Sequence, residues 1–205
     1  MQLRFIYFDL GQVLVRFDHA QMLRQISAAA GVEVGRVQEL LFADGMLMQL
    51  ERGTLSTRQF YDEFCRRLGA RPDYDRLARA ASEFFAFNDE IAPVVMGLRR
   101  GGWRLGILSN TSELHWEYCR RQFALLSDAF AVHVLSYRVG AIKPEPAIYA
   151  AAVAAAGCRP AEIFFTDDIL GHVLGARAAG FDAVQFTGAA ALCRELAQRG
   201  IALAE

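Results

Sequence analysis

The chain has 205 residues, of which 54% are hydrophobic and 22% are charged, and its formal net charge at pH 7 is −1. A chain of this size can form one large domain, or a core domain with a small insert. The near-neutral charge and the lack of any long Lys/Arg run argue against nucleic-acid binding, and no segment approaches the roughly 20 apolar residues of a membrane span. We therefore expect a small-molecule partner, with no nucleic acid and no membrane.

The first predicted element is a strand over residues 3–8, which is followed at once by Asp9 and a turn. In an open parallel sheet, ligands bind outside the carboxyl ends of the strands, so a carboxylate here would face a ligand. Taken alone, however, an aspartate at a strand end is more often a turn former than a nucleophile. Asp9 becomes a candidate catalytic residue only if other strands supply partners.

The next segment, residues 18–87, shows no convincing strand. It contains three amphipathic helical patterns, over residues 19–30, 34–42 and 57–68, with glycines between them. This break predicts a helical cap domain over residues 18–87, inserted into a core domain of residues 1–17 and 88–205. A helical insert directly after the first strand is well placed to fold over a site as a lid.

Strand-like and helical patterns then alternate to the end of the chain. The predicted strands cover residues 104–108, 133–136, 163–166 and 183–186, and the predicted helices cover residues 113–123, 146–156 and 171–179. The helix over 146–156 begins with proline and ends before glycine, which is the expected asymmetry of helix ends. This alternation predicts an α/β fold with a doubly wound parallel sheet.

Three polar clusters follow these later strands. Ser109 and Asn110 follow the second strand, Lys143 follows the third by one loop, and Asp167 and Asp168 follow the fourth. Because parallel strands end at one edge, we expect these side chains to meet the carboxylate that follows the first strand. A nucleophilic acid, a hydroxyl, an amide, a lysine and an acid pair suit attack on a phosphoryl group with a divalent metal. The loop around Lys143 contains glycine and proline, so we expect no core role for the lysine.

Four motifs carry a family resemblance. They are F-D-L-G-Q-V-L at residues 8–14, L-S-N-T at 108–111, I-K-P-E-P at 142–146 and F-F-T-D-D at 164–168. In this order they make the chain resemble the haloacid dehalogenase superfamily of hydrolases, over nearly its whole length. The residues of these motifs are most similar to those of the bacterial branch that includes glucose-1-phosphate phosphatase. The resemblance implies a Rossmann-like core with a small helical cap of the first class.

The resemblance also implies a role for each motif residue. Asp9 would be the nucleophile that forms an aspartyl-phosphate, and Lys143 would neutralise the phosphate and orient Asp9. Phosphate would be bound by Gly11, Ser109, the backbone N–H of Asn110 and Lys143, and Mg²⁺ by Asp9, the Gly11 carbonyl and Asp168, with Asp167 behind them. Such a metal offsets the repulsion between a carboxylate and a phosphate dianion, and hard oxygen ligands suit Mg²⁺.

Two positions depart from the family pattern. Most phosphatases of this superfamily carry a general acid two residues after the nucleophile, where this chain has Gly11. Loss of a positioned acid costs roughly 10²–10⁴ in rate, so we expect either good leaving groups or an acid supplied by the cap or the substrate. After the last motif, Ile169 and His172 replace small polar residues, which alters the support of the metal.

Three functions remain open. The leading prediction is a Mg²⁺-dependent phosphatase of small phosphorylated metabolites, possibly sugar phosphates. The alternatives are a metal-independent 2-haloacid dehalogenase, and a catalytically silent protein that binds a phosphate ligand or a partner. Dehalogenases do not normally carry an acid pair such as Asp167 and Asp168, so this pair favours the phosphatase.

The four cysteines are isolated, with no C-x-x-C pair, and predict free thiols in a reducing cytoplasm. The apolar start of the chain is broken by Asp9 and lacks a small-residue cleavage site, so it does not resemble a signal peptide. We therefore expect a cytoplasmic protein.

Overall fold

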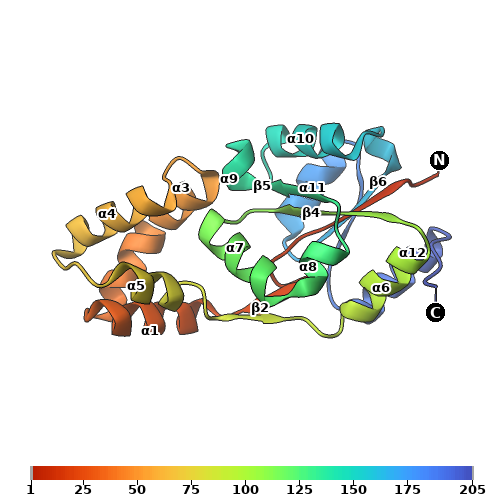
Figure 1. The fold of residues 1–205 in the computed structure, drawn as a ribbon. Coiled ribbons are helices and arrows are strands. Elements are labelled where there is room, and N and C mark those ends of the chain that lie inside the picture. The colour runs from red at the N-terminus through yellow and green to blue at the C-terminus, as the bar shows by residue number, and fades with distance from the viewer. Residues whose placement is uncertain (1, 205) are drawn as a thin grey trace.

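A five-stranded parallel sheet lies at the centre of the computed structural model, which describes residues 2–204 (Figure 1). The strand order is β5-β4-β1-β6-β7, and all four strand pairs are parallel. The strands are β1 (Phe5–Phe8), β4 (Arg104–Ser109), β5 (Val132–Leu135), β6 (Ile163–Asp167) and β7 (Asp182–Gln185). The prediction of a parallel α/β fold is confirmed.

Helices cover both faces of this sheet, as continuous apolar strands require. Ile6 and Phe8 of β1 pack in one apolar cluster, and Phe5 and Tyr7 pack in the other, since successive side chains alternate in direction. The first face carries α6 (Ala92–Arg100), α7 (Glu113–Gln122), α8 (Ala124–Asp128) and α12 (Ala189–Gln198), and the second carries α10 (Pro146–Ala156) and α11 (Leu170–Ala178). A 3₁₀ turn, Pro160–Glu162, precedes β6.

The connection after β5 differs from the prediction. The strand ends at Leu135, and Ser136 begins a short helix, α9 (Ser136–Val139), where a strand end and a simple loop were expected. The reason is that the Ser136 hydroxyl accepts from the backbone N–H of Thr111 at 2.9 Å and donates its one proton to the Glu51 carbonyl oxygen at 2.5 Å. Such side-chain bonds to backbone compete with regular strand pairing.

Helices make up most of the insert, residues 18–87, which lies to the left in Figure 1. They are α1 (His19–Ala30), α2 (Val34–Gln38), a π-helix (Glu39–Ala43), α3 (Met46–Arg52), α4 (Thr57–Leu68) and α5 (Tyr74–Ala80). The helices predicted over 19–30 and 57–68 are confirmed, whereas the one over 34–42 divides into α2 and the π-helix. The insert has its own apolar core, to which Met22, Leu40 and Phe64 belong.

The insert also ends in a strand, so the prediction of none was wrong at this point. Strand β3 (Phe85–Phe87) pairs antiparallel with β2 (Val15–Phe17), in a two-stranded sheet separate from the central one. Strands of three residues are too short for an alternating pattern to appear in the sequence. This pair brings the two ends of the insert side by side. The division of the chain into cap and core domains stays a prediction.

Two further observations concern the whole described chain. All four cysteines are free, and Cys65 and Cys119 are buried. None of the helices within residues 2–204 combines the length and the apolar character needed to cross a bilayer.

Candidate active site

The predicted site residues meet at the carboxyl edge of the central sheet. Asp9 directly follows β1, and Asp167 ends β6, the neighbouring strand. One cavity of about 390 Å³ opens here, and its lining includes Asp9, Gly11, Asn110, Lys143 and Asp168. Ser109 lines a smaller adjoining cavity, together with Gly11 and Asn110. The fold therefore brings every predicted site residue to the two cavities, except Asp167, which lies directly behind them.

Lys143 lies at the centre of this arrangement and is only 2% exposed. Its Nζ lies 2.8 Å from Asp9 Oδ1 and 2.5 Å from Asp167 Oδ2, and it donates to the Leu108 carbonyl oxygen at 3.0 Å. Burial alone lowers the pKa of Lys143, but the two carboxylates outweigh it and hold the pKa above its ordinary value. The lysine is therefore a buried ammonium, and the expectation that it has no core role was wrong.

The two oxygens of Asp9 have different surroundings. Oδ1 accepts from the Leu10 N–H at 2.7 Å and contacts the Lys143 ammonium. Oδ2 has no hydrogen-bond partner among residues 2–204. Burial raises the pKa of Asp9 to about 6, with Lys143 opposing and Asp167 adding to the rise. One oxygen thus fixes the carboxylate, and the other is free to react or to bind a cation.

Asp167 and Asp168 are adjacent but differ in their contacts. Asp167 is fully buried, accepts from the Ile169 N–H at 2.8 Å, and has both oxygens 3.1 Å from His172 Nδ1. Burial would raise the pKa of Asp167, but Lys143 and His172 outweigh it and lower the pKa. The half-buried Asp168 carboxylate has no partner in the described chain, and burial followed by the Asp167 charge raises its pKa. Asp168 therefore has oxygens available to a ligand, whereas those of Asp167 are occupied.

The acids could hold a divalent cation. One carboxylate oxygen from each of Asp9, Asp167 and Asp168 lies within 4.8 Å of the other two. Three carboxylates face one ammonium, so negative charge is in excess. Hard oxygen donors in such a group are the ligands that Mg²⁺ prefers, so the donor set fits this ion.

Asn110 has a positioning contact that the sequence did not predict. Its Oδ1 accepts from the backbone N–H of Lys143 at 2.7 Å, and its Nδ2 donates to the Lys143 carbonyl oxygen at 3.1 Å. The neighbouring Ser109 is buried, and its hydroxyl donates to the Asn110 carbonyl oxygen at 3.3 Å. The Asn110 side chain therefore holds the turn that carries Lys143. The phosphate-binding roles of Ser109 and of the Asn110 N–H stay predictions.

An aromatic ring fills the space beside Gly11. A Cβ atom at this glycine would lie 2.9 Å from Phe17 Cε1, which is closer than side chains normally approach. The backbone of Gln12 is left-handed, with φ 54°, and its Nε2 donates to the Phe17 carbonyl oxygen at 2.9 Å. The ring, at the end of β2, also packs against Phe85 at a centroid distance of 5.7 Å. An acidic side chain at position 11 would need Phe17 to move.

The sequence also missed a carboxyl group that faces the site. Glu51, in the last turn of α3, lines both the main cavity and the adjoining one. Burial, then the charge of Asp9, raise the pKa of Glu51 to about 7, with Lys143 opposing. A glutamate in an amphipathic helix is indistinguishable by pattern from one on a solvated face, so no sequence signal identified it.

The rest of the main cavity is largely apolar and comes mostly from the insert. The apolar side chains that line it are Phe17, Leu41, Phe42, Leu47, Met48, Ile142 and Ile169. Among its lining side chains, Phe42, Met48 and Ile169 are 41%, 55% and 49% exposed, so the cavity is open to solvent. Lys143 is the one Lys or Arg among its lining residues in the described chain.

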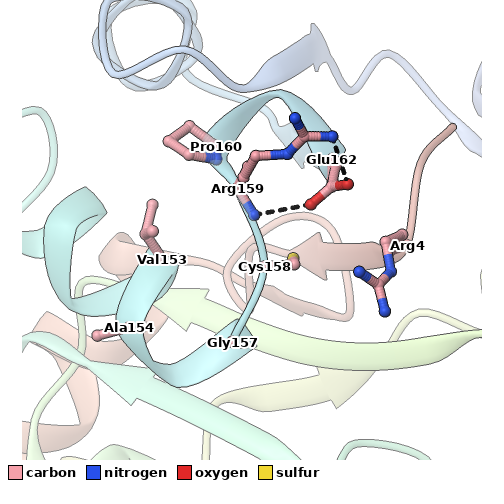
Figure 2. Close-up of a pocket in the computed structure, with 8 residues that line it drawn as sticks. All are labelled: Arg4, Val153, Ala154, Gly157, Cys158, Arg159, Pro160 and Glu162. Carbon is pink, nitrogen blue, oxygen red and sulfur yellow. Dashed lines mark hydrogen bonds and ion pairs between the residues drawn. The ribbon is translucent and has the colours of Figure 1, made fainter. Parts of the chain in front are cut away.

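A larger but shallower hollow lies away from these groups. It measures about 690 Å³ and is lined by Arg4, Cys158 and the 3₁₀ turn before β6 (Figure 2). The Glu162 carboxylate there already accepts from the backbone N–H and the guanidinium of Arg159, both at 2.9 Å (Figure 2). Arg4 precedes β1 and Glu162 precedes β6, so this hollow lies at the opposite edge of the sheet from Asp9. None of the predicted site residues lines it.

Comparison with known proteins identifies a family and several similar phosphatases. The family model described as haloacid dehalogenase-like hydrolase matches residues 4–180. A phosphatase from Mycobacterium tuberculosis is 28% identical over 193 residues, covering 89% of this chain and 87% of that protein. A glyceraldehyde 3-phosphate phosphatase from Methanopyrus kandleri is 30% identical over 165 residues, covering 76% of this chain and 70% of that protein.

A solved structure shares the fold over most of the chain. It is a HAD family enzyme from Bacteroides thetaiotaomicron in complex with magnesium and inorganic phosphate, with a TM-score of 0.82 and 24% identity. The match covers 91% of this chain and 95% of that chain. At this level of identity the likeness shows the fold.

Proposed function

Because the chain belongs to the haloacid dehalogenase-like hydrolases, we propose that it is a Mg²⁺-dependent phosphatase of small phosphorylated metabolites, sugar phosphates among them. Asp9 is the nucleophile in this proposal. Residues 18–87 act as a cap, and the remaining residues form the core. The observation that carries the proposal is the divided environment of Asp9, with Oδ1 held by Lys143 and the Leu10 N–H and Oδ2 free at the cavity.

The chemistry follows from these contacts. Asp9 Oδ2 attacks phosphorus, the bond to the leaving oxygen breaks, and an aspartyl-phosphate forms; water then releases phosphate and restores the carboxylate. Lys143 holds the attacking carboxylate in one orientation and places a positive charge beside the transferred group. Ser109 and the Asn110 N–H hold phosphate oxygens, and the Asn110 side chain keeps Lys143 in place.

Magnesium fits the acid group at this edge. Asp9, the Gly11 carbonyl and Asp168 would hold the ion, with Asp167 behind them. When bound, Mg²⁺ supplies positive charge that offsets repulsion between the carboxylate and the phosphate. The fold neighbour from Bacteroides thetaiotaomicron, which binds magnesium and inorganic phosphate, supports this assignment.

The size and lining of the cavity support a small substrate. A volume of about 390 Å³ is in the range of small-molecule sites, and the apolar lining favours a leaving group without a second negative charge. Two relatives named as phosphatases, one of them for glyceraldehyde 3-phosphate, support the same class of reaction. The free thiols support a reducing, cytoplasmic setting.

A phosphate-release screen tests the proposal. The substrates are sugar phosphates, nucleotides, acyl phosphates and an aryl phosphate, each with Mg²⁺ and with a chelator. We expect release that requires Mg²⁺, strongest for small uncharged leaving groups, and none from Asp9→Asn. No release from any substrate would overturn the proposal. Halide release from 2-haloacids in chelator would support the dehalogenase instead.

A further inference from the structure

The proposed reaction lacks a proton donor at its usual place. When the leaving oxygen departs from phosphorus it gains charge, and a positioned acid normally neutralises that charge. Gly11 has no side chain, and the Phe17 ring occupies the space into which one would point. A donor must therefore come from another element that reaches the same cavity.

Glu51 meets this requirement by its position. It comes from α3 of the insert and lines the same cavity as Asp9, Gly11 and Lys143. It also lines the adjoining cavity with Gly11 and Phe17, so it borders the space beside the glycine. Within residues 2–204 its carboxyl has no hydrogen-bond or ion-pair partner, although its backbone does. The carboxyl is therefore free to serve a ligand.

The backbone around Glu51 is firmly attached to the core. Its carbonyl oxygen accepts from the Ser136 hydroxyl at 2.5 Å. The next residue, Arg52, donates to both oxygens of Glu145, at 3.0 and 2.6 Å. A helix end held in this way keeps the backbone that carries Glu51 at a constant place relative to the core, so the carboxyl stays within the same cavity as Asp9.

Resting on the proposed phosphatase activity, we propose that Glu51 is the proton donor and acceptor that replaces the missing acid at position 11. As Asp9 attacks and the phosphorus–oxygen bond breaks, the Glu51 carboxyl gives its proton to the leaving oxygen. The resulting Glu51 carboxylate then takes a proton from the water that attacks the aspartyl-phosphate. Phosphate is released, and both carboxyl groups return to their starting states.

Two observations on protonation agree with this role. The pKa of Glu51 is raised to about 7, so both of its forms are populated near neutral pH. His115, in contrast, lines the adjoining cavity but donates from Nε2 to the Ala81 carbonyl oxygen, and burial lowers its pKa to about 4. The ionisable groups around the two cavities, Glu51 apart, are Asp9, His19, His115, Lys143, Asp168 and His172, with Asp167 behind them.

The test is the dependence of rate on the leaving group. Turnover is measured for aryl and alkyl phosphates of increasing leaving-group pKa, with the native chain and with Glu51→Gln, in saturating Mg²⁺. We expect a shallow dependence for the native chain and a steep one for the variant. Alkyl phosphate turnover should fall roughly 10²–10⁴-fold, and aryl phosphate turnover should fall much less.

A second readout follows the enzyme rather than the product. With a fast-leaving aryl or acyl phosphate, acid-quenched Glu51→Gln should hold more aspartyl-phosphate than the native chain, because water activation is impaired. Glu51→Asp should restore part of the shallow dependence. The matched control is Glu33→Gln, which removes an exposed carboxylate of the insert and should match the native chain in both readouts.

The outcomes separate the two proposals. If the native chain releases no phosphate from any substrate, the proposed function fails. If the native chain is active but Glu51→Gln shows the same dependence of rate on leaving-group pKa and the same level of aspartyl-phosphate as the native chain, Glu51 is not the donor. A steep native slope would show that no donor acts at all. If Glu51→Gln does not fold, Glu51→Asp must still slow alkyl more than aryl phosphates, and an equal effect on both rejects the role.

Discussion

Asn110 and Lys143 exchange two hydrogen bonds, from the Lys143 N–H to Asn110 Oδ1 at 2.7 Å and from Asn110 Nδ2 to the Lys143 carbonyl oxygen at 3.1 Å. The pair joins the end of β4 to the turn before α10. Lys143 therefore reaches Asp9 from a backbone that a neighbouring strand holds in place.

Asn110→Ala should weaken catalysis by releasing this turn. A small displacement of a catalytic group can cost about 10²-fold, so we expect kcat/KM to fall by about that factor. Steady-state kinetics with the preferred substrate checks this, and a thermal melt shows whether the variant stays folded. Unchanged kcat/KM in a folded variant would mean that Lys143 needs no support from Asn110.

Lys143→Met should lose both activity and stability. The substitution leaves the buried carboxylates of Asp9 and Asp167 without their shared cation. Breaking a buried ion pair on one side costs roughly 3–5 kcal/mol, so the melting temperature should drop clearly. Adding Asp167→Asn to the same chain should recover part of that loss but none of the activity. A melting temperature equal to that of the native chain would contradict the buried arrangement.

Asp9→Asn should abolish turnover while preserving the fold. The amide keeps the shape of the carboxylate but is not a nucleophile, so phosphate release should fall to background. The variant should also form no acid-stable phosphoenzyme. Residual turnover well above background would assign the nucleophile to another group.

The two adjacent acids should respond differently to metal. Asp168→Ala should raise the Mg²⁺ concentration needed for half-maximal activity more than Asp167→Ala, because the Asp168 oxygens are free. Asp167→Ala should lower the melting temperature more, since Asp167 accepts from Lys143 and from the Ile169 N–H. Activity and melting curves over a Mg²⁺ titration measure both effects. Full activity in chelator would reject the metal role and favour the dehalogenase.

Acid should destabilise the fold through His115. Burial lowers the pKa of His115 to about 4, from an ordinary value of 6.5, so the unfolded chain binds a proton that the folded chain does not. The contribution of neutral His115 to the free energy of unfolding is therefore fully present above pH 6.5. It is lost as the pH falls toward 4, and the loss amounts to at most about 3 kcal/mol. His115→Gln should flatten the unfolding free energy over this range. Equal slopes for the two chains would show that His115 titrates normally.

Local sequence patterns predicted most of the central fold. The apolar runs marked the five sheet strands because buried parallel strands are continuously hydrophobic. Strands β2 and β3 were not predicted because three residues are too few to show an alternating pattern. Residues 34–42 were predicted as one helix because a π-helix and an α-helix have similar amino-acid compositions. Strand β3 forms by pairing with β2 outside the insert, and the π-helix packs against α2 and α3 inside it, so both depend on contacts between segments.

The site was predictable only in part, for a related reason. Asp9 and Asp168 follow apolar strands, so their positions could be inferred from the chain order. The contact of Phe17 with Gly11 depends on the turn that leads into β2, and the contact of Glu51 with the cavity depends on how the insert packs against the core. The burial of Lys143 depends on two carboxylates from other strands, which its own loop does not reveal.

The attachment of α3 to the core also determines the route of substrate and product. For that end of the insert to swing outward, the Ser136–Glu51 hydrogen bond and the Arg52–Glu145 ion pair must break together. At Gly53 the two segments lie so close that any side chain would collide with the Tyr137 carbonyl oxygen. We therefore expect this end of α3 to stay in place while substrate and product pass, so the size of the cavity's opening to solvent, and not a hinge at α3, selects what can enter.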